Sequence, residues 1–216
     1  MPDLAGFGHV VAMQLRGAIP ERRCAYETEQ RLRAGQKVVA LAQQEIERFP
    51  DDRHEFKPGG IGDRARGNAG VGVAENIMSG TVHVKGDASQ SAGATGCGGL
   101  LIIDGNASAR CGISMKGVDI VVKGSVGHMS AFMAQAGSLV VLGDAGESLG
   151  DSIYEARLYV RGKVQSLGAD CIEKPMTDHH RAKLAAKLEA AGVTGADVGA
   201  FKRYGSARRL YHFHVD

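Results

Sequence analysis

The chain has 216 residues, of which 31 are glycine and only 5% are aromatic. Collagen is excluded because only 5 residues are proline, and a hydrophobic fraction of 44% excludes a disordered low-complexity chain. The 26 basic and 24 acidic residues nearly balance, which argues against nucleic acid or an anionic membrane as a partner. No apolar run approaches the ~18 residues of a membrane helix, and the 4 cysteines form no CxxC pair. We therefore expect a cytoplasmic protein with reduced thiols.

Residues 1–66 are predicted to be a segment of their own, because the repeat described next does not extend into them. Good helix formers, with apolar residues at roughly helical spacing, run from Glu27 to Phe49, and Pro50 follows. We expect this N-terminal segment to be partly helical.

From Gly67 onward, glycine recurs every 19 residues without insertion or deletion. From the second copy on, each of these glycines follows an aliphatic stretch. We expect the glycine to turn a corner with a positive φ, which glycine adopts without steric cost. The structural corner glycines are Gly67, Gly86, Gly105, Gly124, Gly143 and Gly162. Numbering each repeat from its glycine, a second corner is expected at position 14, where Gly80, Gly99, Val118, Gly137 and Ala156 lie.

Two columns of the repeat are aliphatic in every copy. Position 16 is Val82, Leu101, Ile120, Leu139 or Leu158, and position 18 is Val84, Ile103, Val122, Val141 or Val160. Residues two apart in a strand share one face, and β-branched residues favour strands. A 19-residue unit has no room for a long helix, so we predict an all-β fold, a right-handed parallel β-helix of 19-residue coils over residues 67–174.

Position 17 faces outward from these strands and is also largely apolar. Its residues are His83, Ile102, Val121, Val140 and Tyr159. An apolar strip on the outside of a rod has to be covered, and the chain's own tail and a partner chain are equally good candidates.

Residues 175–216 are predicted to form a helix and a docking tail. Thr177 can cap the helix and Gly192 can end it. The apolar stripe of the helix is Leu184, Ala185, Leu188 and Ala191.

We predict no catalytic, cofactor-binding or metal-binding residue in this chain. The carboxylates Glu75, Asp151 and Glu155 show no paired arrangement of the kind that acid–base catalysis requires, because the neighbouring coils have residues such as Ala94, Ile113 and Phe132. The histidines at 179–180 and 212–214 lack an acidic residue or cysteine at a spacing that completes a metal site. The sequence therefore indicates a scaffold.

The glycine-punctuated repeats resemble the GXGXG β-helix domain found at the C-terminus of the large subunit of glutamate synthase and in one of the subunits of formylmethanofuran dehydrogenase. The resemblance is greatest to the stand-alone glutamate-synthase-like subunit of N-methylglutamate synthase. The stretches that carry it are GVAEN at 72–76, SQSAG at 89–93, CGISMKG at 111–117, GHMSA at 127–131, GDSIYEA at 150–156 and SLGADC at 166–171.

This resemblance implies a heteromeric complex in which the chain braces an amidotransferase-like subunit and a synthase-like subunit that carries FMN and an iron–sulfur cluster. The chain would flank a tunnel for ammonia or methylamine, and the complex would form N-methylglutamate and ammonia from glutamate and methylamine. Catalysis would belong to the complex, with this chain itself non-catalytic. Residues expected at the interface or beside the tunnel are Glu75, Asn76, Ser89, Gln90, Ser114, Lys116, His128, Asp151, Tyr154 and Glu155.

Two alternatives from other classes stay open. One is the β-helix subunit of a formyl-transferring complex of the formylmethanofuran type. The other is an independent β-helix enzyme that uses the outer face of the rod.

Overall fold

The computed structural model describes the backbone of residues 62–65 and all of residues 67–210. The helix predicted at Glu27 to Phe49 and the last six residues of the tail lie outside these described residues.

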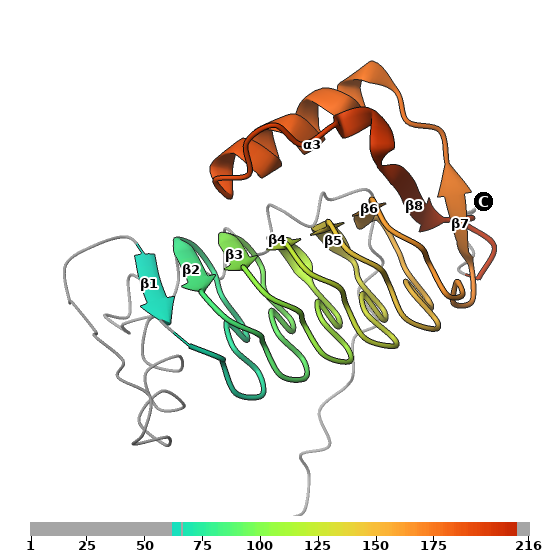
Figure 1. Cartoon of the computed structure of the whole chain (residues 1–216). Helices are drawn as coiled ribbons and strands as arrows, with labels where there is room; N and C mark the ends of the chain where they lie inside the picture. Colours follow the sequence, from blue (N-terminus) through green and yellow to red (C-terminus); the bar gives the residue numbers. More distant parts are fainter. Residues whose placement is uncertain (1–61, 66, 211–216) are drawn as a thin grey trace, which may run out of the picture.

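Six parallel strands form one side of a rod, each a single 19-residue step after the last (Figure 1). They are β1 Gly62–Ala65, β2 Thr81–Val84, β3 Leu100–Ile103, β4 Lys116–Val122, β5 Ala136–Val141 and β6 Arg157–Val160. The predicted parallel β-helix with 19-residue coils is confirmed. Its sheet begins with β1, ahead of Gly67, because Gly62 pairs with Thr81 one step later.

The interior is filled by the two aliphatic columns. Leu101, Ile120, Leu139 and Leu158 at position 16 are fully buried, as are all five residues of position 18. A third column of small residues at position 3 forms a ladder of single parallel bridges on another side of the coil, and its residues are Ala69, Ala88, Ala107, Val126, Ala145 and Val164. Stacked aliphatic side chains therefore fill a coil that has no room for large aromatics.

The corner glycines are needed for a reason that the sequence did not reveal. Gly86, Gly105, Gly124, Gly143 and Gly162 lie directly after the strands, but none has a positive φ. A Cβ on Gly124 would lie 2.6 Å from the carbonyl oxygen of Gly105 and 2.8 Å from its carbonyl carbon. Close approach of successive coils, rather than an unusual backbone angle, excludes a side chain here.

Positive φ occurs instead at the second predicted corner, position 14. Gly80, Gly99 and Gly137 have φ values of 82°, 80° and 95°. In the coil where Val118 takes this position, the preceding Gly117 has a φ of 153°, and the pairing of β4 with β5 shifts register nearby.

The residue after each corner glycine links one coil to the next through its side chain. The Asp87 amide donates to Asn68 Oδ1 at 2.8 Å, and the Asn106 amide donates to Asp87 Oδ1 at 2.6 Å. The same bond joins Ser125 to Asn106, Asp144 to Ser125 and Lys163 to Asp144. This polar ladder stops at Lys163, whose side chain has no acceptor to offer a further coil.

The outward apolar strip is covered by the chain's own C-terminal helix. The helix α3, Asp178–Ala190, lies over the strands (Figure 1). Its Leu184 and Leu188 form one buried cluster with Ile102, Val121 and Val140 of the sheet. Of the two candidate covers, the chain itself is the correct one.

The helix differs from expectation in two details. Thr177 is the N-cap residue, but its hydroxyl pairs with His180 Nδ1 at 2.7 Å and makes no cap bond to the backbone. Ala185, expected in the apolar stripe, is exposed. The helix ends as predicted, with Gly192 at a φ of 67°.

The tail adds two antiparallel strands that the sequence did not predict as a pair. β8, Lys202–Ser206, follows the short 3-10 helix η1, Val198–Ala200, and inserts between β6 and β7, Cys171–Lys174. The last parallel strand is therefore not left as an open edge. Within residues 67–210, no helix is long and apolar enough to cross a lipid bilayer.

Candidate functional site: the left-handed arc of the coils

The side of each coil away from the sheet contains three residues in the left-handed helical region, at positions 6, 8 and 10. We call this surface, positions 4 to 13 of the coils from residue 67 to residue 161, the left-handed arc. The fifteen residues with positive φ are Gly72, Ala74, Asn76, Ser91, Gly93, Thr95, Arg110, Gly112, Ser114, Met129, Ala131, Met133, Ser148, Gly150 and Ser152. The spacing of three positive-φ residues at alternate positions matches that of a GXGXG pattern.

Most of these residues are not glycine, so their conformation has to be held by the surrounding structure. A left-handed backbone costs an L-residue about 1–2 kcal/mol. Hydrogen bonds between coils hold it in place. At positions 6 and 10, the amides of Arg110 and Ser114 donate to the next coil at 2.9 and 2.7 Å, whereas at position 8 the Ala131 amide donates to the preceding coil at 2.7 Å. Because these amides are used between coils, the arc offers no free nest of N–H groups for an anion.

All ten predicted interface residues lie at positions 4 to 13 of the coils, although one of them, Lys116, is also the first residue of β4. Glu75, Asn76, Gln90, His128 and Tyr154 are exposed there, while Ser89, Ser114, Lys116, Asp151 and Glu155 are partly buried. They are spread along the rod and do not converge on one point.

Several of the ten already have partners within the chain. Asn76 Oδ1 accepts from Thr95 Oγ1 at 2.6 Å, and Glu155 pairs with Arg208 at 2.9 Å. Asp151 accepts from the Ser152 hydroxyl at 2.7 Å and from the Ala169 amide at 3.1 Å. The contacts of Asn76 with Thr95 and of Asp151 with Ala169 join neighbouring coils, whereas that of Glu155 joins a coil to the C-terminal tail.

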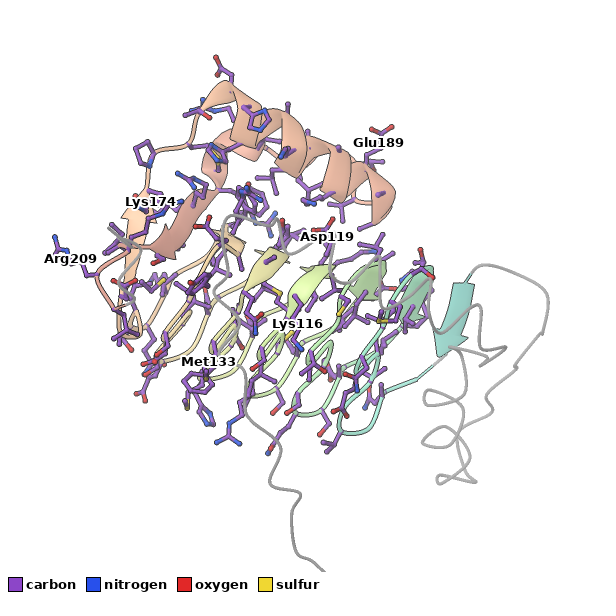
Figure 2. The ribbon with its side chains drawn as sticks, turned by 180° about the vertical axis from the view of Figure 1, so that it is seen from behind. Lys116, Asp119, Met133, Lys174, Glu189 and Arg209 are labelled. Carbon is purple, nitrogen blue, oxygen red and sulfur yellow. The ribbon has the colours of Figure 1, made fainter. Side chains whose placement is uncertain are left out.

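The sequence prediction missed the apolar part of the arc. Met133 is 45% exposed and Tyr154 is 36% exposed, and they lie on adjacent coils because the Met133 amide donates to the Asp151 carbonyl. Figure 2 shows Met133 on the edge of the rod away from α3. One signal was available: Phe132 and Met133 stand where the first coil has Glu75 and Asn76.

Two cysteine thiols of the rod, those of Cys111 and Cys171, are buried. Burial raises the pKa of the Cys111 thiol to about 12, and burial together with Asp170 and Asp151 raises the pKa of Cys171 to about 12. Among residues 67–210, no three His, Cys, Asp or Glu side chains gather as metal ligands would.

One charged network is strongly coupled, and it lies at the corner of the first coils. Asp104 accepts from Lys123 at 2.7 Å, His83 at 2.9 Å and Lys85 at 3.2 Å. Burial alone would raise the pKa of Asp104, but these hydrogen bonds hold it well below its usual range. The network joins three successive coils, so we interpret it as structural.

Comparison with known proteins gives one partial match. Over 69 residues the chain is 68% identical to Protein GlxC of Rhizobium meliloti (strain 1021). The match covers 32% of this chain and 30% of that protein. The chain therefore shares homology with GlxC over about a third of its length. No protein-family model and no solved structure matches the chain.

Proposed function

We propose that the chain is a non-catalytic β-helix scaffold subunit of a glutamate-synthase-like complex of the N-methylglutamate synthase type. The observation that carries this proposal is the uninterrupted stack of 19-residue parallel coils, to which the resemblance to the GXGXG β-helix domain applies. The partial identity to GlxC supports it, since we take GlxC to be a protein of the same glutamate-synthase-like kind.

In this proposal the left-handed arc is the surface that contacts the partner subunits. The outward strip of Ile102, Val121 and Val140 is already covered by α3, so this strip is not available to another chain. The arc, by contrast, keeps Met133, Tyr154 and Val71 exposed, at 45%, 36% and 56%. Exposed apolar side chains surrounded by polar ones are typical of protein interfaces.

The partners would be an amidotransferase-like subunit and a synthase-like subunit with FMN and an iron–sulfur cluster. The arc would brace them and flank the path that ammonia or methylamine follows between them. Two observations agree with a scaffold role. The thiols of Cys111 and Cys171 are buried, and the polar residues are spread along the arc, where they supply contact area rather than a reaction centre.

Co-purification tests the proposal. The full chain, tagged and expressed in its native source, should elute in a large assembly with flavin and iron–sulfur absorbance. A Met133→Asp variant should lose much of that absorbance, because it places a charge at the centre of the apolar part of the arc. An Ala185→Asp variant, on the exposed side of α3, is the matched control and should retain it. A monomeric chain with no flavin-bearing partner would contradict the proposal.

A further inference from the structure

A cluster of cations lies at the end of the rod where β6, β8 and β7 meet the start of α3. On the outward face of these strands, Tyr159 lies directly opposite Arg203, and Arg203 lies directly opposite Lys174. Arg157 lies on the same face, two residues before Tyr159 on β6. Figure 2 shows Lys174 at this end of the rod, from which α3 departs.

These positive charges lack a counter-charge within the chain. Among residues 67–210, no carboxylate forms an ion pair with Arg157, Lys174 or Arg203. Like charges directly opposite one another on neighbouring strands destabilise a sheet. Glu173, the acidic residue next to Lys174, pairs instead with Lys202 at 3.1 Å.

The cations are close enough to act on one another. Burial lowers the pKa of Arg203, and the charge of Arg157 lowers it further. The pKa of His180 on α3 is lowered by burial and then by Arg203 and Arg157, so His180 belongs to the same cluster. The Arg203 side chain is held in place, because its Nε donates to the Pro175 carbonyl at 3.0 Å.

A second observation is independent of these charges. Tyr159 is fully buried, and its hydroxyl has no hydrogen-bond partner. An unsatisfied buried hydroxyl is destabilising and therefore rare in native structures. Burial raises the pKa of Tyr159, Arg157 and Arg203 lower it, and Asp119 raises it, so the hydroxyl lies near the cation cluster. The Asp119 carboxylate is itself paired with Lys187.

Gly205 lies two residues after Arg203 on β8 and is buried. A Cβ there would meet only the Ala156 carbonyl at 3.7 Å and Lys174 Cγ at 3.9 Å. These are ordinary contact distances, so no close approach of the backbone requires glycine at this position.

We propose that this cluster binds an oxyanion, a carboxylate or phosphate group, through the guanidinium groups of Arg157 and Arg203. Lys174 and His180 lie beside these guanidinium groups, and the Tyr159 hydroxyl donates a hydrogen bond to the anion. The planar fork of arginine matches both carboxylate and phosphate, and a bound anion would neutralise the repulsion and satisfy the hydroxyl. The site lies on the side of the rod covered by α3, apart from the left-handed arc. This proposal therefore does not depend on the proposed function.

Titration calorimetry on the full chain tests this proposal, with inorganic phosphate and succinate as probes at constant ionic strength. We expect saturable binding of at least one probe, and the tighter one identifies the anion class. The affinity should fall about tenfold in Arg157→Gln and in Arg203→Gln, which each remove a charged hydrogen-bond donor. Arg110→Gln, which removes an exposed cation on the arc, is the matched control and should bind as the parent does. No saturable binding of either probe by the parent, or an affinity in both variants equal to that of the parent, would overturn the proposal.

Thermal unfolding gives a second readout that a purely structural role would not produce. Without added anion, Arg157→Gln should unfold at a higher temperature than the parent, because repulsion is relieved. Phosphate should raise the melting temperature of the parent but not that of this variant. Tyr159→Phe should likewise be stabilised without anion and should bind the anion more weakly. A parent that gains no stability from phosphate or succinate while its variants lose stability would show a structural cluster and overturn the proposal.

Discussion

The coils and the C-terminal segment are held together in different ways. In the coils, residues 67–161, each contact recurs every 19 residues, as in the aliphatic columns and the polar ladder. In the C-terminal segment, residues 171–210, the contacts occur once, as in Lys187 with Asp119 and Arg208 with Glu155. The fold tolerates variation in one copy of a repeated contact, as Val118 shows at position 14, because the other copies remain. Loss of a contact that occurs once is not compensated by other copies.

The largest expected effect comes from breaking one coil. Gly124→Val would place a side chain against the backbone of Gly105, which cannot move without displacing the coil before it. We expect the free energy of unfolding to fall by about 3 kcal/mol or more, measured by chemical denaturation.

The control for this variant lies in the C-terminal segment. Gly192 has a positive φ, but a Cβ there would meet nothing within 4 Å. Gly192→Ala should therefore cost only about 1 kcal/mol, the cost of the left-handed backbone. If the two variants lose the same stability, close approach is not what excludes a side chain at position 1.

The second prediction separates the covering helix from the coils. Leu188→Ala removes a buried side chain from the cluster between α3 and the sheet, so it should cost about 2–4 kcal/mol. Hydrogen exchange should show that amides of α3 lose protection while those of β3 to β5 keep most of theirs. Ala185→Ser, an exposed change on the same helix, should leave both unchanged. Equal loss of protection in coils and helix would mean that the two regions unfold as one unit.

The third prediction uses pH to weigh one network in the coils. The pKa of Asp104 is depressed in the folded state, so its ion pairs stabilise the fold above the ordinary pKa of 3.8 and lose this effect as pH falls below it. Asp104→Asn should therefore cost about 1 kcal/mol at neutral pH, and the difference from the parent should vanish in acid. Asp144→Asn keeps a side-chain acceptor for the Lys163 amide and should show little difference at either pH. A difference for Asp104→Asn that does not change with pH would argue against the ion pairs.

The same contrast explains what could be predicted from the sequence. Periodicity shows a contact that recurs, so the strands, their faces and the aliphatic columns follow from the spacing of Leu101, Ile120 and Leu139. Contacts that occur once leave no such trace, and the position of β8 between β6 and β7 was therefore missed. The covering of Val121 and Val140 by α3 could be narrowed only to two alternatives. For the candidate site, the ten polar and aromatic residues followed from the family resemblance, and neither the resemblance nor the spacing could show that Met133 would be exposed on the coil next to that of Tyr154.

The smallest expected effect tests the strain in the left-handed arc. Met133 has a φ of 52° and its side chain is 45% exposed, so glycine would relieve the backbone while losing little packing. Relief of about 1–2 kcal/mol is partly offset by the greater freedom of glycine in the unfolded chain, which leaves a gain of about 0.5 kcal/mol. Gln135→Gly, an exposed residue on the same coil without positive φ, should instead lose about 0.5–1 kcal/mol.

Under the proposed function, Met133→Gly should also weaken binding of the flavin-bearing partner, because it removes an apolar contact. A variant that is more stable yet assembles less well would show that the strain at Met133 serves the interface. If Met133→Gly were less stable than the parent, the packing of the Met133 side chain would contribute more to stability than its left-handed backbone costs.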